Sequence, residues 1–229
     1  MEHKMDWTLF YGERAGTDAL LLADFARNAR GTRGADLGCG SGAVMLLLLL
    51  YGTGRHMTGI DIRESAVEAC RENLRRFGLT GRGDAVPADY RRAPFEPGSM
   101  DFLVSNPPYF RAGCGGVSPD PERAAQRTET ATVAELCRAA AWYLKDGGSF
   151  YLVHRTEREP EILAALREAS LTAVRRCTVF SAPGKTAPIF LLEAVKGAPE
   201  RDITHESVLL RDRDGRETNE YRKICLWEA

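Results

Sequence analysis

The sequence predicts a Rossmann-like α/β fold: a mainly parallel seven-stranded sheet with an antiparallel terminal hairpin and helices on both faces. Three observations support this fold class. Strand-like and helix-like segments alternate from residue 33 onward. A glycine-rich turn at 36–42 separates the first strand of this series from its first helix. Near the end of the chain, two strand-like segments follow each other without a helix between them.

The first half of the chain contains four expected strands and two expected helices. In order, they are strand 33–37, helix 41–51, strand 56–60, helix 64–77, strand 85–88 and strand 100–105. Glycines close the two helices, at Gly52 and Gly78. The second, third and fourth strands end at polar residues, which are Asp61, Asp89 and Asn106. Parallel strands joined by right-handed crossovers bring such residues to one edge of the sheet.

The second half continues the alternation and then changes its pattern. The expected elements are helix 132–144, strand 149–154, helix 159–169, strand 173–180 and strand 189–195. Two adjacent glycines in the run 145–148 indicate a turn after the first of these helices. The turn-prone run 181–184 joins the last two strands, so one of them should run antiparallel to the rest of the sheet.

The length of the chain favours one domain with short extensions. We expect an N-terminal segment and helix at 1–32, the main α/β domain at 33–197, and a C-terminal hairpin or lid of the same domain at 198–229. Thr17 and Asp18 precede an apolar run and are expected to cap the N-terminal helix. The alternative is that this segment folds over a ligand.

Composition restricts the class of protein without identifying it. The chain has 31 Lys and Arg against 32 Asp and Glu, so its charge neither implies nor excludes a nucleic acid partner. The 6 cysteines lack metal-ligand spacing, which indicates reduced thiols and no structural metal. The N-terminus lacks a signal-peptide pattern, and the leucine-rich run 43–51 is too short to span a membrane. We therefore expect a cytoplasmic protein.

The glycine turn and two strand-end aspartates indicate a nucleoside ligand. The glycines let the backbone approach the ligand closely, and the following helix offers unpaired amide groups. Asp61 is placed to accept hydrogen bonds from ribose hydroxyls, and Asp89 from an adenine amino group near the backbone of Ala88. A dinucleotide enzyme is the alternative, but these glycines run G-x-G-x-G and not G-x-G-x-x-G. Otherwise, both aspartates are only turn residues or helix caps.

The run Asn106-Pro107-Pro108-Tyr109 suits chemistry on a planar amino nitrogen. Such a nitrogen is a poor nucleophile until acceptors orient its hydrogens and stabilise the positive charge that develops on it. The Asn106 side-chain oxygen and the Pro107 carbonyl suit this role, and the prolines hold them in place. Tyr109, helped by Phe110, offers a ring for base stacking. The alternative is that the prolines only end a strand and Tyr109 packs in the core.

At these residues the chain resembles the bacterial tRNA1(Val) adenine-N6 methyltransferases, which are class I S-adenosylmethionine-dependent enzymes. The resemblance covers almost the whole chain, in the segments 16–22, 36–42, 106–110, 144–155, 184–185, 192–197 and 212–221. It implies methyl transfer to the N6 amino group of the adenosine just 3′ of the anticodon. That adenine would be flipped out of the loop at a cost of a few kcal/mol.

The resemblance also implies a set of site residues. The implied catalytic residues are Asn106, Pro107, Pro108 and Tyr109. The implied cofactor-binding residues are Thr17, Asp36, Gly38, Gly40, Gly42, Asp61, Ile62, Ala88, Asp89 and Asn106. The implied substrate-binding residues are Tyr109, Phe110, Arg123 and Arg127. No metal or membrane is implied, the partner is tRNA, and we expect a monomer or weak homodimer. Where the family often has Ala-Arg-His-Glu, this chain has Thr128 in place of the histidine.

Three other functions share parts of this pattern. A glutamine-N5 methyltransferase of release factors uses the same Asn-Pro-Pro-Tyr chemistry, but such enzymes carry a sizeable helical domain before the glycine turn. An rRNA guanine-N2 methyltransferase is a comparable alternative. A non-catalytic module that binds tRNA or protein is the third, and the intact Asn106, Tyr109 and glycine turn argue against it.

Overall fold

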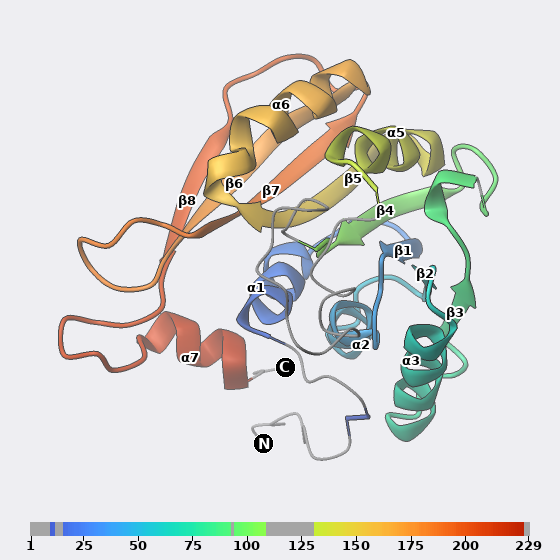
Figure 1. The fold of residues 1–229 in the computed structure, drawn as a ribbon, viewed down its shortest axis with the longest axis horizontal. Coiled ribbons are helices and arrows are strands. Elements are labelled where there is room, and N and C mark those ends of the chain that lie inside the picture. Colours follow the sequence, from blue (N-terminus) through green and yellow to red (C-terminus); the bar gives the residue numbers. More distant parts are fainter. Residues whose placement is uncertain (1–9, 12–15, 93, 109–130, 227–229) are drawn as a thin grey trace, which may run out of the picture.

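The computed structural model describes residues 10–11, 16–92, 94–108 and 131–226 (Figure 1). Its helices are α1 (Thr17–Ala26), α2 (Ala43–Leu50), α3 (Glu64–Arg76), α5 (Val133–Tyr143), α6 (Glu159–Glu168) and α7 (Asn219–Leu226). Its strands are β1 (Arg33–Leu37), β2 (His56–Asp61), β3 (Gly83–Pro87), β4 (Met100–Ser105), β5 (Leu144–Arg155), β6 (Leu171–Phe180), β7 (Ile189–Lys196) and β8 (Thr204–Leu209). Two short 3-10 helices are η2 (Tyr90–Arg92) and η3 (Thr156–Arg158).

One 8-stranded sheet has the order β3-β2-β1-β4-β5-β7-β6-β8. The chain moves outward from β1 through β2 to β3 and then returns to β4, on the other side of β1. Strand order therefore reverses between β1 and β4, and ligands of open α/β sheets bind beyond the carboxyl ends of the strands at such a point. β7 runs antiparallel to both β5 and β6. The predicted fold class, mainly parallel with an antiparallel terminal hairpin, is confirmed.

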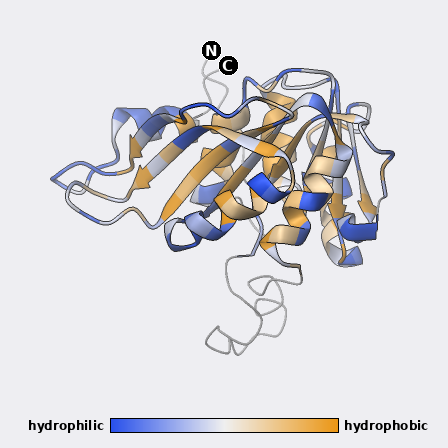
Figure 2. Cartoon of the chain, turned by 90° about the horizontal axis from the view of Figure 1, so that it is seen from above, coloured by the Kyte–Doolittle hydropathy of each residue, from blue (hydrophilic) through white to orange (hydrophobic). Residues whose placement is uncertain are grey.

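The sheet separates two hydrophobic cores. Phe102 and Val104 of β4 pack with α1, α2 and α3, whereas Leu103 between them packs with α5 and α6 on the other face (Figure 1). Figure 2 shows that hydrophobic residues concentrate in the strands between these helix layers. Because β4 is covered on both faces, its consecutive residues Phe102, Leu103 and Val104 are all buried.

The run 145–148 differs from the expected turn, because β5 begins at Leu144, directly after α5. The register between β4 and β5 shifts at this point: Met100 pairs with Leu144, but Phe102 pairs with Ser149. The additional residues bulge out of the ladder, and Gly147 takes a positive φ of 78°. The two glycines therefore mark a bulge within the strand.

The C-terminal residues add an eighth strand to the seven expected, because β8 pairs in parallel with β6. Residues 204–207 are exposed, so β8 lacks the apolar alternation by which a strand is recognised in a sequence. Beyond β8, a bridge between Arg211 and Glu217 closes a short turn. Tyr221 and Ile224 of α7 then join the core beside α1.

The expected cap of α1 is wrong. Gly16 occupies the N-cap position, and it has no side chain with which to cap the helix. The Thr17 hydroxyl instead lies 3.2 Å from the hydroxyl of Tyr221 in α7. Among the described residues, no helix is long and apolar enough to cross a membrane.

Helix α5 begins with a complete capping box. The Thr132 hydroxyl accepts a hydrogen bond from the Glu135 backbone at 3.2 Å, and the Glu135 carboxylate accepts one from the Thr132 backbone at 2.7 Å. We expect Thr132→Ala to lower the free energy of unfolding by about 1 kcal/mol, because the helix start loses its cap. Urea unfolding measures this change, and an unchanged midpoint and slope would contradict it.

Candidate functional site

The glycine turn follows β1 at the point where strand order reverses. The backbone N–H groups of Gly38 and Cys39 donate to the Ile60 carbonyl at 2.8 and 2.9 Å, which ties the turn to the end of β2. Gly38 and Gly40 have φ values of 79° and 55°, and open space lies where their side chains would be. This part of the turn therefore needs glycine for its backbone and leaves room for a ligand.

Asp61, at the end of β2, is buried, and its carboxylate binds the backbone of the glycine turn. One carboxylate oxygen accepts the Gly40 N–H at 3.0 Å, and the other accepts the backbone N–H of Arg63 at 3.0 Å. The Arg63 side chain adds a bond at 3.2 Å. The bond to Arg63 is the local contact expected if Asp61 were only a turn residue. The bond to Gly40 shows that Asp61 also contacts the glycine turn.

Asp36, at the end of β1, is 2% exposed. Its Oδ2 has no hydrogen-bond partner in the part of the chain that the structure describes. Burial raises the pKa of this carboxyl to about 7, and the negative charge of Asp61 adds to the shift. A buried carboxyl oxygen without a partner, open space beside two glycines and the Asp61 carboxylate fit a cofactor that carries positive charge and a ribose.

The pH dependence of the protein's stability should reveal the raised pKa of the Asp36 carboxyl. Below a pKa of about 7 this group stays protonated when folded, but in the unfolded chain it ionises above about 3.8. The folded state binds more protons in that range, so the free energy of unfolding should fall by roughly 2 kcal/mol from pH 5 to pH 7 and level off above.

Urea unfolding of the wild type and of Asp36→Asn, both without cofactor, isolates this contribution. The variant cannot ionise at this position, so the difference in stability between the two proteins should change across pH 5, 6 and 7. A constant difference would contradict the raised pKa.

The adenine end of the predicted site lies beyond β2 and β3. Ile62 is 55% exposed and presents an apolar side chain beside Asp61. The backbone N–H of Ala88 donates to the Asp61 carbonyl at 3.0 Å, which joins the two strand ends. The structure thus brings Ile62, Ala88 and Asp61 together at the carboxyl edge of the sheet.

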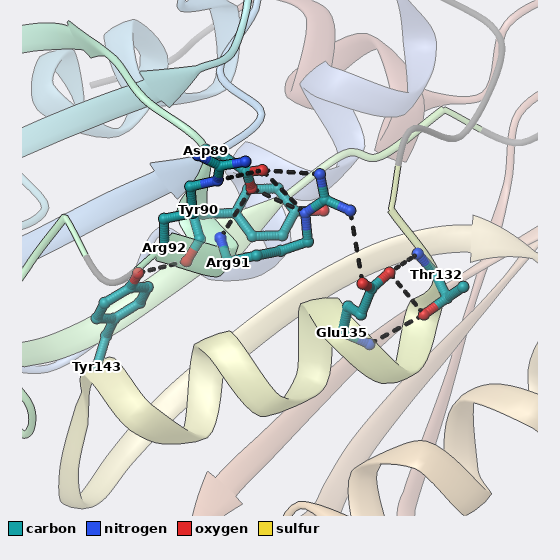
Figure 3. A network of polar contacts seen from close by, with 7 residues as sticks. All are labelled: Asp89, Tyr90, Arg91, Arg92, Thr132, Glu135 and Tyr143. Carbon is teal, nitrogen blue, oxygen red and sulfur yellow. Dashed lines mark hydrogen bonds and ion pairs between the residues drawn. The ribbon is translucent and has the colours of Figure 1, made fainter.

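Asp89 is engaged by its own loop (Figure 3). Its carboxylate accepts bonds from the Arg91 side chain at 2.7 and 2.9 Å and from the Arg91 backbone at 3.0 Å. These bonds hold the pKa of Asp89 below its usual range. Arg91 also reaches Glu135 at 3.5 Å, and the Tyr143 hydroxyl donates to the Tyr90 carbonyl. The loop is therefore fastened to both ends of α5.

Asn106 and its prolines follow β4 directly, and Asn106 is half-buried. The Ser105 hydroxyl donates to the Leu37 carbonyl at 2.7 Å, which ties the end of β4 to the end of β1. Val104 pairs with Asp36, so extending the register by two residues brings Asn106 level with Gly38. Asn106 thus adjoins the glycine turn. Tyr109, Phe110, Arg123, Arg127 and Thr128 lie outside the described residues.

Three contacts were not predicted: those of Arg63 with Asp61, of Arg91 with Asp89, and of Thr17 with Tyr221. Asp61-Ile62-Arg63 and Asp89-Tyr90-Arg91 share the spacing Asp-x-Arg, and in each the arginine binds the preceding carboxylate through its backbone and side chain. That repeated spacing is the sequence signal that identifies them. Tyr221, which contacts Thr17, has no such signal, because 204 residues separate the two. Among the described residues, no group of three His, Cys, Asp or Glu could hold a metal ion.

Comparison with known proteins identifies the class of enzyme. The fold matches a predicted O-methyltransferase of Agrobacterium tumefaciens with a TM-score of 0.73 at 21% identity, over 91% of this chain and 95% of that one. The family described as methyltransferase small domain matches residues 14–177. Together with the glycine turn and the Asn-Pro-Pro run, these matches define an S-adenosylmethionine-dependent methyltransferase.

Two curated relatives identify the family. The tRNA1(Val) (adenine(37)-N6)-methyltransferase of Bacteroides thetaiotaomicron is 30% identical over 181 residues, which are 78% of this chain and 75% of the relative. The enzyme of the same name from Shewanella amazonensis is 31% identical over 206 residues, which are 89% of this chain and 86% of the relative. The chain belongs to the family of tRNA1(Val) (adenine(37)-N6)-methyltransferases, as its motifs indicated.

Proposed function

We propose that this protein transfers a methyl group to the N6 amino group of an adenine in the anticodon loop of a tRNA of the tRNA1(Val) type. One observation carries the proposal: the Asn106-Pro107-Pro108 run adjoins the glycine turn. The tRNA1(Val) (adenine(37)-N6)-methyltransferases that match most of this chain support it. The proposal places the enzyme in the cytoplasm, as a monomer or weak homodimer.

Asn106 and Pro107 orient the amino group of the substrate. The side-chain oxygen of Asn106 and the carbonyl of Pro107 accept its two hydrogens, which turns the nitrogen lone pair toward the methyl donor. The same acceptors stabilise the positive charge that develops on nitrogen. No strong base is required, because the amino proton becomes acidic only as the new N–C bond forms and the S–C bond of the methyl donor breaks, and water can then accept this proton. Pro107 and Pro108 restrict the backbone, so the acceptors are in place before the substrate arrives.

The residues at the ends of β1, β2 and β3 hold the cofactor. When bound, S-adenosylmethionine supplies a methyl group on a positively charged sulfur. Asp61 accepts bonds from the ribose hydroxyls, and Ile62 packs against the adenine face. Asp89 shares its carboxylate between Arg91 and the adenine amino group, beside the backbone of Ala88. The remaining cofactor contacts come from Thr17, Asp36, Gly38, Gly40, Gly42 and Asn106.

The substrate contacts of the proposal come from the segment after Pro108. Tyr109 and Phe110 stack on the flipped adenine, an interaction worth roughly 1–3 kcal/mol for one base. Arg123 and Arg127 contact phosphates of the tRNA. Two arginines of β6 are engaged within the protein instead: Arg175 binds Glu193 at 2.9 Å, and Arg176 binds Glu159.

The test is transfer of radiolabelled methyl from S-adenosylmethionine to bulk tRNA that lacks this modification, with release factor in a parallel reaction. Nucleoside analysis should find the label in N6-methyladenosine. Label only in the release factor would assign glutamine methylation instead. Label in neither would overturn the proposal and favour a guanine substrate or a non-catalytic protein.

A further inference from the structure

Asn73 of α3 is a buried polar residue that joins two backbone segments. It is 0% exposed. Its Oδ1 accepts the Tyr11 N–H at 2.6 Å, and its Nδ2 donates to the Tyr11 carbonyl and to the Ser41 carbonyl, each at 2.9 Å. All of these partners are backbone groups, and they lie 62 and 32 residues away in the sequence. A single carboxamide therefore connects the N-terminal residues to the glycine turn.

The turn rests on α3 at a second point beside Asn73. Gly42, next to Ser41, packs so closely on Cys70 that a Cβ at Gly42 would lie 2.5 Å from the Cys70 sulfur. Cys70 and Asn73 are three residues apart and share one face of α3. The backbone of the turn is thus held by packing at Gly42 and by a hydrogen bond at Ser41.

Tyr11 also contacts α3 through its side chain. The Arg76 guanidinium lies 5.0 Å from the centre of the Tyr11 ring. Phe10 is 7% exposed and belongs to the core formed with α1, α2 and α3. Tyr11 is therefore fixed by Asn73 at its backbone and by Arg76 at its ring, which orients both backbone groups toward Asn73.

We propose that Asn73 is a positioning residue for cofactor binding: it sets the Ser41 carbonyl, and with it the amide groups of the glycine turn, in a position that depends on residues 10 and 11. Both N–H groups of the amide are donated, so movement of either backbone segment leaves a buried polar group without a partner, which is costly. Apolar packing alone would not require asparagine here, because this face of α3 is otherwise lined by Val67, Cys70 and Leu74. The inference rests on the proposed function for the location of the cofactor.

Asn73→Asp tests the Ser41 connection without changing side-chain volume. The carboxylate loses both donated bonds and faces two carbonyls. We expect the Kd for S-adenosylhomocysteine, measured by calorimetry on the full chain, to rise about tenfold or more. The KM for S-adenosylmethionine should rise in parallel, while kcat at saturating cofactor and the KM for tRNA stay within about twofold. A lower active fraction with an unchanged Kd would mean a merely structural role and would overturn the proposal.

Tyr11→Pro and Tyr11→Ala test the N-terminal connection with Asn73 in place. Both remove the ring, but only proline removes the N–H that Asn73 accepts. We expect a severalfold higher Kd for the proline variant than for the alanine variant, and equal values would overturn this half of the proposal. Glu68→Gln, an exposed change on α3, is the control and should bind as the wild type does. If the wild type itself fails to bind, the proposed function fails too; normal wild-type binding with an unchanged Kd in Asn73→Asp overturns this inference alone.

Discussion

Replacing Asn106 with alanine is expected to lower the rate of methyl transfer about 10²–10³-fold at saturating cofactor and tRNA. The side-chain oxygen of Asn106 is a preorganised acceptor for a nitrogen that becomes positive only in the transition state. Its removal therefore reduces kcat more than it weakens the binding of either substrate. The Pro107 carbonyl remains in place, so residual activity should be measurable.

Three measurements separate this role from a loss of fold or of cofactor affinity. Calorimetry with S-adenosylhomocysteine should give a Kd that rises severalfold at most, because Asn106 is only one of several cofactor contacts, and this effect is much smaller than the loss in kcat. Asn28→Ala, an exposed asparagine after α1, is the matched control and should retain full turnover. Single-turnover methylation of tRNA should show the full loss in the chemical step. If Asn106→Ala turned over at the wild-type rate, the proposed catalytic role would be wrong.

The elements that the sequence predicts well are those encoded by neighbouring residues. β1, the glycine turn and α2 follow one another in the chain, and each carries its own signal. α2 begins two residues later than expected, at Ala43, because Gly42 takes a left-handed conformation at its N-cap. Asp61 was found because it ends an apolar strand, and parallel strands bring such residues to one edge of the sheet.

The features that the sequence does not predict depend on partners far apart in the chain. β8 is a strand because β6 offers it a free edge, and its exposed residues carry no periodic pattern. In the sequence, Asn73 only interrupts the apolar face of α3. Its role depends on Tyr11 and Ser41, which lie 62 and 32 residues away in the chain. The same distance explains Thr17, whose sequence context indicates a cap but whose hydroxyl contacts Tyr221.

Replacing Asp61 with asparagine is expected to weaken cofactor binding about 10²-fold, because hydrogen bonds to a charged acceptor are worth about 1.5–3 kcal/mol each. The carboxylate already accepts the N–H groups of Gly40 and Arg63 through its two oxygens. Asparagine must turn its amide hydrogens toward one of these donors. The variant therefore loses both the acceptor for a ribose hydroxyl and part of the support of the glycine turn.

Loss of affinity in this variant should not be loss of fold. Asp61→Asn weakens the support of the glycine turn, but it also removes the negative charge that helps to raise the pKa of Asp36. Because these two effects on stability oppose each other, the variant without ligand should unfold near the wild-type temperature. The wild type should gain thermal stability from S-adenosylhomocysteine, since a ligand that binds only the folded state stabilises it, and the variant should gain almost none. Asp146→Asn, whose side chain is 94% exposed, is the matched control and should keep the full gain. An equal gain in Asp61→Asn would show that this carboxylate does not hold the ribose.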